Sequence, residues 1–65
     1  MELDCLGLRC PIPIIKLARA LKEVNEVVLL SDDPATEPDL VAWSRMTGNS
    51  FEVLATATYL VKRNE

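Results

Sequence analysis

The sequence predicts an α/β fold, a two-layer sandwich of order β-α-β-α-β-β in which both helices cover one face of a four-stranded mixed sheet. Two segments space their apolar residues as helices do, and four have the alternating or continuous apolar character of strands. Helical and strand-like segments also alternate along most of the chain. With 65 residues, the chain forms one domain at most, residues 1–65, and only one sheet face can be covered.

The first strand and the first helix are predicted on either side of a short loop. Residues 1–5 alternate, with Leu3 and Cys5 on one face, which is typical of a half-buried strand, and Gly7 ends this pattern. The apolar residues that follow have the i, i+3, i+4, i+7 spacing of one helical stripe. They are Ile14, Leu17, Ala18 and Leu21.

The next two elements are a buried strand and a second helix. Residues 27–30 form a continuous apolar run that is typical of a strand buried in a sheet. Residues 36–39, Thr-Glu-Pro-Asp, have the spacing of a capping box and predict that a helix begins there. Its apolar residues are Leu40, Val41, Trp43 and Met46, and Gly48 favours its end. We interpret Trp43 as a core residue in preference to a platform for a ligand.

Two alternating segments at the end of the chain predict a hairpin. Residues 51–55 and 59–61 alternate as strands do. The tight turn between them, residues 56–58, contains no glycine to support it.

Composition excludes several kinds of site. The chain has no histidine, which rules out Cys–His nucleophile pairs and mixed Cys/His zinc sites, and we expect no metal or cofactor. The two cysteines, Cys5 and Cys10, do not form the disulfide framework of a small secreted domain. Met1 is followed at once by a strand-like run without the basic and apolar regions typical of a signal peptide, and no apolar run approaches the roughly 20 residues of a membrane helix. We therefore expect a soluble cytoplasmic protein with reduced thiols that does not bind membranes.

The charge of the chain is unevenly distributed. The net charge is −3, yet residues 1–22 carry four basic and two acidic side chains, against three basic and eight acidic in residues 23–65. This asymmetry indicates either a partner that docks near Lys16 and Arg19 or simply a solvated helix face. An acidic chain with one tryptophan and one tyrosine is a poor candidate for direct nucleic-acid binding.

The segment around Cys10 predicts a reactive thiol at a helix entrance. Pro11 fixes its own φ angle and favours extended geometry at Cys10, so the helix begins at Pro11 or, because Pro13 disfavours helical geometry at Ile12, at Pro13. A helix N-terminus and the adjacent Arg9 both lower the pKa of a thiol. Since prolines lack N–H groups, the amides of Ile12 and Ile14 are the expected donors to the sulfur. The alternative is that Cys10 is a small buried apolar residue.

The residues near this thiol have weaker signals. We expect burial for Cys5, which shares a strand face with Leu3, and the alternative is a resolving thiol that forms a disulfide with Cys10. Asp4 is a candidate to orient the loop through Gly7 or Arg9. Asp32 and Asp33, next to Pro34, have the character of turn and cap residues, not of a catalytic carboxylate pair.

The run LDCLGLRCPIPIIKLARAL resembles the start of the TusA/SirA-like sulfur-carrier family. Its Asp-x-x-Gly-Leu-x-Cys-Pro-x-Pro pattern is met here by Asp4, Gly7, Leu8, Cys10, Pro11 and Pro13. The stretch SDDPATEPDLVAWSRMTGNSFEV is similar to the family's Asp-Pro turn, second helix and helix-ending glycine. The resemblance therefore covers nearly the whole chain and implies the same βαβαββ sandwich.

The resemblance implies a function that composition alone does not. Cys10 would carry sulfur as a persulfide, accept it from a donor such as a cysteine desulfurase, and relay it to an acceptor in tRNA thiolation, molybdenum-cofactor biosynthesis or sulfur oxidation. Such a carrier acts with partner proteins, and we expect it to be a monomer. The rival hypotheses are a non-catalytic interaction or regulatory module and a thiol redox protein that uses Cys5 and Cys10. The chain departs from the family in its short final hairpin without glycine and in its additional Cys5.

Overall fold

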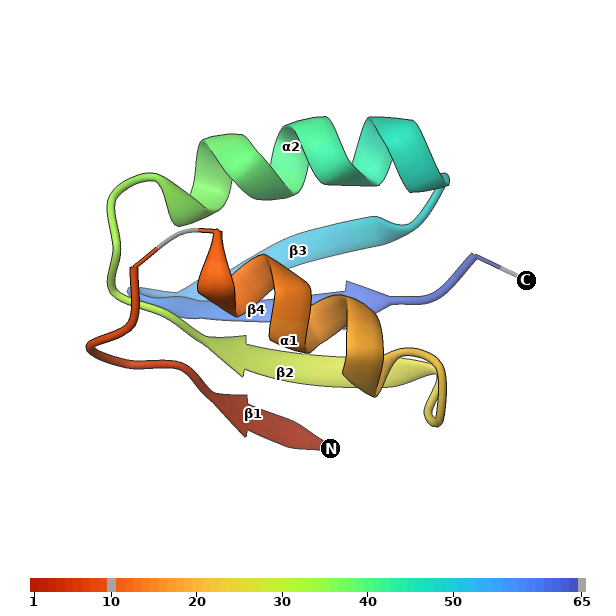
Figure 1. The fold of residues 1–65 in the computed structure, drawn as a ribbon, viewed down its shortest axis with the longest axis horizontal. Helices are drawn as coiled ribbons and strands as arrows, with labels where there is room; N and C mark the ends of the chain where they lie inside the picture. Colours follow the sequence, from red (N-terminus) through yellow and green to blue (C-terminus); the bar gives the residue numbers. More distant parts are fainter. Residues whose placement is uncertain (10, 65) are drawn as a thin grey trace.

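A computed structural model describes residues 1–9 and 11–64 and has the predicted element order β-α-β-α-β-β (Figure 1). The elements are β1 (Glu2–Asp4), α1 (Ile12–Ala20), β2 (Glu26–Leu30), α2 (Thr36–Thr47), β3 (Ser50–Ala55) and β4 (Thr58–Lys62). The boundaries differ from the sequence prediction by only a few residues at each end, as is usual where helices and strands fray.

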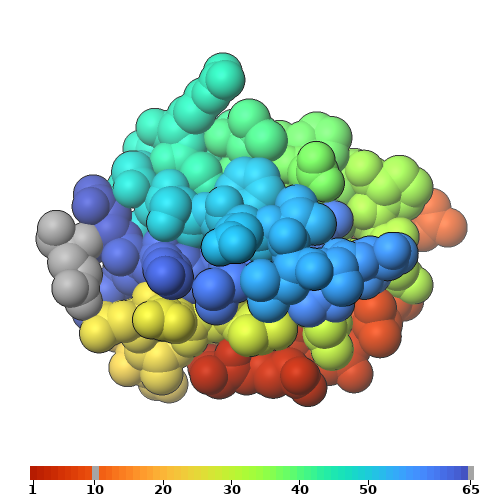
Figure 2. Space-filling view, turned by 180° about the vertical axis from the view of Figure 1, so that it is seen from behind, coloured from red at the N-terminus to blue at the C-terminus, as the bar shows by residue number. Residues whose placement is uncertain are grey.

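The four strands form one mixed sheet in the order β1-β2-β4-β3. β1 and β2 are parallel, because α1 crosses over between them, and the other two pairs are antiparallel. Both helices lie on one face of the sheet (Figure 1), and Figure 2 shows the opposite side, where the strands themselves form much of the surface. The predicted two-layer sandwich is confirmed.

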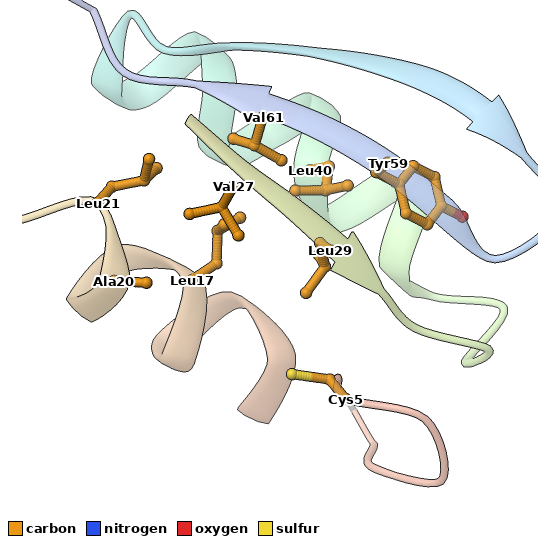
Figure 3. Close-up of a cluster of buried hydrophobic side chains, with 9 residues drawn as sticks. All are labelled: Cys5, Leu17, Ala20, Leu21, Val27, Leu29, Leu40, Tyr59 and Val61. Carbon is orange, nitrogen blue, oxygen red and sulfur yellow. The ribbon is translucent and has the colours of Figure 1, made fainter. Parts of the chain in front are cut away.

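The hydrophobic core lies between the helices and the sheet (Figure 3). Alternation along the paired strands β2 and β4 turns every second side chain toward the helices. The buried apolar residues are Cys5, Leu17, Ala20, Leu21, Val27, Leu29, Leu40, Tyr59 and Val61. One continuous cluster thus joins α1, α2 and both central strands.

The buried stripe of α1 is rotated relative to the prediction. Leu17 and Leu21 are buried as expected, but Ile14 and Ala18 are only partly buried. Pro13 and Ala20 are buried instead. The apolar ring of Pro13 occupies a core position at the start of the helix, which the apolar spacing counted from Ile14 did not include.

The predicted capping box of α2 is wrong. Ala35 is the N-cap residue and makes no side-chain cap, whereas Thr36 already lies inside the helix. The Thr36 hydroxyl is buried and bonds with the Ser31 hydroxyl at 2.6 Å. Asp33 closes the preceding turn, because its Oδ1 accepts the Ala35 N–H at 2.9 Å. A buried hydroxyl needs a partner, and Ser31 supplies one that sequence spacing does not reveal.

The predicted end of α2 at Gly48 is confirmed, whereas its predicted apolar face is confirmed only in part. Gly48 has a left-handed φ of 77° and its N–H donates to the Ser44 carbonyl at 2.8 Å. Leu40 is buried and Trp43 packs against the core, which confirms the interpretation of Trp43 as a core residue. Met46, in contrast, is 86% exposed, so it does not belong to the buried stripe.

The end of the chain ties the two layers together. The Arg63 N–H donates to the Asn25 carbonyl, and Arg63 Nη1 donates to the Leu21 carbonyl at 3.0 Å. This side chain satisfies a carbonyl just beyond the C-terminus of α1. The Asn64 N–H donates to Asn49 Oδ1 at 2.7 Å, next to the end of α2.

Candidate functional site

Cys10, the central residue of the predicted site, lies outside the described residues. The site is therefore built from the residues on both sides of Cys10 in the chain and from the loop that faces them. These are the loop that follows β1, the first turn of α1 and the loop that follows β2.

The loop after β1 is a short, hydrogen-bonded turn. The Cys5 N–H donates to the Leu30 carbonyl at 2.8 Å, which continues the pairing with β2, and the Leu8 N–H donates back to the Cys5 carbonyl at 3.1 Å. Gly7 adopts a φ of 80°, a left-handed conformation that glycine takes without strain. The chain thus reverses within a few residues before it reaches Arg9.

Two carboxylates hold this loop, and only one was expected to do so. Asp4 Oδ1 accepts the Leu6 N–H at 3.0 Å, so Asp4 orients the loop through Leu6 and not through Gly7 or Arg9 as predicted. The Gly7 N–H donates instead to Asp32 Oδ1 at 3.0 Å, from a residue 25 positions along the chain. Sequence reasoning assigned Asp32 only a turn or cap role. The available signal was the parallel pairing of β1 with β2, which brings the loops that follow both strands to one edge of the sheet.

The helix begins at Ile12, between the two starting points that the prolines allowed. Pro11 is the N-cap residue, with φ −93° and ψ 12°, and Pro13 occupies the second helical position with its ring in the core. Neither position needs an N–H for the helix ladder. The Ile12 N–H donates to the Arg9 carbonyl at 2.9 Å. The turn itself uses the amide of Ile12, and the expectation that the amides of Ile12 and Ile14 serve the sulfur stays a prediction.

The helix entrance combines a positive helix end and basic side chains with two carboxylates from the loop after β2. The first turn of α1 contains no acidic side chain of its own, so no residue of that turn offsets its partial positive charge. Arg9 precedes the helix and is exposed, and Lys16 lies one turn into it. An open hollow of about 290 Å³ beside Arg9 is lined by Gly7, Leu8, Arg9, Asp32, Asp33 and Pro34. A hollow of this kind admits a group of a docked partner but encloses no substrate.

Cys5 is a core residue, as predicted. Its side chain is fully buried and points toward α1 (Figure 3). Burial raises the pKa of the Cys5 thiol above its usual range; the positive charge of Lys16 acts in the opposite direction, and the negative charge of Asp4 raises this pKa further. A buried, protonated thiol is a poor nucleophile, which argues against the resolving-thiol alternative.

The outer face of α1 combines exposed apolar and basic residues. Ile12, Ile15, Lys16 and Arg19 are all exposed, and their spacing places them on one side of the helix, away from the core. We call these four residues the outer α1 face. Sequence reasoning found the two basic residues but missed Ile12 and Ile15, because a pattern that counts apolar residues toward a core does not count exposed ones.

Neither a metal cluster nor a membrane-spanning helix is found in the described part of the chain. Among residues 1–9 and 11–64, no three His, Cys, Asp or Glu side chains gather to hold a metal ion. Neither described helix is both long and apolar enough to cross a membrane.

Comparison with known proteins identifies the family. The family model described as sulfurtransferase TusA matches residues 1–62, which is nearly the whole chain. The chain belongs to the TusA family. This match includes the motif around Cys10 and the loop that carries Asp32, so the site described above lies within the TusA domain.

Two relatives, each named "Putative sulfur carrier protein", agree with this assignment. The protein from Archaeoglobus fulgidus is 43% identical over 53 residues, which cover 77% of this chain and 69% of that protein. The protein from Aquifex aeolicus is 32% identical over 71 aligned positions, which cover 97% of this chain. This TusA-family chain spans only 36% of the length of the Aquifex protein.

Proposed function

We propose that this TusA-family chain is a sulfur carrier that accepts sulfane sulfur as a persulfide on Cys10 and relays it to an acceptor protein. The observation that carries the proposal is the family match across residues 1–62, because it includes the complete motif of Asp4, Gly7, Leu8, Cys10, Pro11 and Pro13. The names of the two relatives support the same role.

The proposed reaction is a pair of thiol–persulfide exchanges. The Cys10 thiolate attacks the outer sulfur of a donor persulfide, a new S–S bond forms, and the donor leaves as a thiolate. An acceptor thiolate then attacks the outer sulfur on Cys10, and the Cys10 thiolate leaves. Neither step involves a net oxidation or reduction, so no redox cofactor is required. This chain has no histidine, and the partners supply the groups that move protons.

The surroundings of Cys10 in the chain support thiolate formation. A free thiol with a pKa of about 8.5 is mostly protonated at neutral pH, and a helix N-terminus or a neighbouring cation lowers that pKa. The first turn of α1 has no acidic residue, and Arg9 directly precedes Cys10. Pro11 at the N-cap and the buried Pro13 restrict the backbone just after Cys10. These features favour a nucleophilic sulfur held near one position.

The outer α1 face is the proposed docking surface for the donor. Exposed Ile12 and Ile15 provide apolar contact area, while Lys16 and Arg19 favour an acidic partner surface. The donor would be a cysteine desulfurase or another persulfide-bearing protein. The acceptor determines whether the sulfur serves tRNA thiolation, molybdenum-cofactor biosynthesis or sulfur oxidation. We place the chain in the cytoplasm as a monomer of one domain, 1–65, which engages its partners in turn.

Intact-mass spectrometry tests this proposal. The wild-type chain is incubated with a cysteine desulfurase and cysteine, then its mass is compared with those of Cys10→Ser and Cys5→Ala. We expect wild type and Cys5→Ala to gain the mass of one sulfur atom and Cys10→Ser to gain none. The Cys5→Ala variant is the matched control, because it removes the other thiol and leaves the proposed carrier intact.

The rival functions give different results in the same experiment. A non-catalytic interaction module would show no added sulfur on the wild type while the desulfurase is independently active. A redox protein that uses both thiols would lose two hydrogen atoms in mass after mild oxidation, and Cys5→Ala would abolish this change. The burial of Cys5 and the raised pKa of its thiol favour the carrier over the redox protein.

A further inference from the structure

The loop that follows β2 contacts the loop that leads to Cys10, and this contact is not explained by the sequence motif. Asp32 Oδ1 accepts the Gly7 N–H at 3.0 Å. The two residues are 25 positions apart, so this bond joins two separate loops at one edge of the sheet. Asp33, its neighbour in sequence, holds the start of α2 instead.

We propose that Asp32 is a positioning residue for sulfur transfer, which fixes the loop before Cys10 by accepting the hydrogen bond of Gly7. This inference rests on the proposed carrier function. Asp32 acts through the backbone of Gly7 and does not itself take part in the exchange.

The loop before Cys10 needs such an anchor because few other contacts hold it. Gly7 is exposed, and a Cβ atom built on it would meet no atom within 4 Å, so side-chain packing does not restrain this point of the loop. Leu6 is also 49% exposed. Leu8 is the one residue of this short stretch that packs against the core. The hydrogen bonds that Asp4 and Asp32 accept, together with the bond from the Leu8 N–H to the Cys5 carbonyl, therefore carry much of the restraint.

The residue before Asp32 is buried and hydrogen-bonded to two other parts of the chain. This residue is Ser31; its hydroxyl bonds with that of Thr36 and its N–H donates to the Ala57 carbonyl at 3.0 Å. Asp32 thus follows a residue fixed by both α2 and the β3–β4 turn. The Asp32 side chain itself is exposed, and its hydrogen bond with the Gly7 N–H links the loop before Cys10 to this fixed residue.

Restraint of this loop matters for the exchange because the attacking sulfur must meet the donor sulfur along one line. Misplacement of a reacting group by about 1 Å can lower a rate by about 100-fold. The loop reaches the helix entrance within two residues of Gly7, through Leu8 and Arg9, and the Arg9 carbonyl accepts the Ile12 N–H. A wider range of backbone positions at Gly7 would therefore also be expected at Arg9 and Ile12, which lie on either side of Cys10 in the chain.

Three substitutions separate a positioning role from a charge effect. Asp32→Ala removes the acceptor, whereas Asp32→Asn removes the charge but keeps a carbonyl oxygen that can accept the Gly7 N–H. Glu37→Gln removes one negative charge from the exposed first turn of α2 and leaves both the Asp32 carboxylate and the Gly7 N–H in place. Urea unfolding of each variant establishes the conditions under which all are folded.

The measured quantities are the rate of sulfur transfer from a desulfurase and hydrogen exchange at the Gly7 amide. For Asp32→Ala we expect roughly a 10-fold slower transfer and faster exchange at Gly7. Asp32→Asn should stay within about threefold of wild type, because a neutral hydrogen bond from the Gly7 N–H replaces the charge-assisted one and keeps the loop in place. Glu37→Gln should match wild type in both measurements.

The outcomes that overturn the inference differ from those that overturn the carrier function. Transfer by Asp32→Ala at the wild-type rate would exclude a positioning role. Equal loss in Asp32→Asn and Asp32→Ala would show that the charge matters and the hydrogen bond does not. Absence of sulfur on the wild-type chain, in contrast, would overturn the carrier function itself.

Discussion

At the scale of single residues, the Cys5 thiol lies in the core while its neighbours in sequence face water. Cys5 is fully buried, whereas Asp4 and Leu6 are exposed. Burial favours the uncharged thiol and raises the pKa of Cys5 in the folded chain. The Cys5 side chain therefore stabilises the fold as a small apolar residue, and this contribution requires that its thiol stays protonated.

This burial predicts a pH dependence of stability. The unfolded thiol has a pKa of about 8.5 and the folded thiol a higher one, so the stability that Cys5 contributes is complete below about pH 8.5 and is lost as pH rises through the folded pKa. In a Cys10→Ser background, the free energy of unfolding should fall with a slope of up to about 1.4 kcal/mol per pH unit in this window. Urea unfolding at several pH values measures it.

The matched control is Cys5→Ala in the same background. This variant lacks the titrating thiol, and its stability should fall less steeply over the same pH range. Identical slopes in the two proteins would contradict the assignment of Cys5 to a desolvated core position.

Single residues also show what the sequence could not predict at the site. The burial of Cys5 followed from strand alternation, and the prolines limited the start of α1 to within one residue of Ile12. The bond from Gly7 to Asp32 did not follow, because it depends on which loops the sheet brings together. The pairing of Thr36 with Ser31 was missed for the same reason, since capping patterns read only local spacing.

At the scale of elements, the β3–β4 hairpin has a strained turn. Ala57 adopts a φ of 58°, a left-handed conformation that costs a non-glycine residue about 1–2 kcal/mol. The sequence marked this turn as unsupported, and the structure shows the strain directly. A register shift between Val53 and Ala55 bends β3 just before it.

The strained turn predicts a stabilising substitution. Ala57→Gly should raise the free energy of unfolding by about 0.5–1 kcal/mol, because the strain it removes exceeds the extra entropy of glycine in the unfolded chain. Ala55→Gly, two residues earlier in β3, is the control and should lower stability by about 0.5–1 kcal/mol. Urea unfolding compares them, and a loss of stability in both variants would contradict the strain.

The presence of each helix and strand was easier to predict from the sequence than which of its faces is buried. Periodicity predicted both helices and all four strands, because their apolar residues face one common core. It misjudged α1, where Pro13 takes a core position, and α2, where Met46 points to solvent. Counting apolar residues at helical spacing misjudges prolines and residues at helix ends, since neither follows the interior geometry of a helix.

At the scale of the whole molecule, the two sides of the sandwich differ in character. The helical side carries the outer α1 face, with Lys16 and Arg19, beside the loop that leads to Cys10. The helix-free side of the sheet carries Lys62, whose strand neighbours Tyr59 and Val61 point into the core. A partner that reaches Cys10 is therefore expected to contact the helical side.

Charge reversal tests this docking geometry. Lys16→Glu combined with Arg19→Glu should slow sulfur loading from a desulfurase about 10-fold or more at low salt, and the salt dependence of the rate should weaken. Lys62→Glu, which reverses one charge on the other side of the sheet, is the control and should change the rate little. Equal slowing by both variants would indicate a general charge effect and exclude a specific docking face.

The location of the transferred sulfur tests the central claim most directly. Trypsin cleaves after Arg9 and Lys16, so it separates Cys5, in peptide 1–9, from Cys10, in peptide 10–16. The wild-type chain is loaded with a desulfurase and cysteine, alkylated to trap persulfides, digested and measured by mass spectrometry. The carrier function predicts one extra sulfur atom on peptide 10–16. Extra sulfur only on peptide 1–9, or on neither peptide while the desulfurase is active, would contradict it.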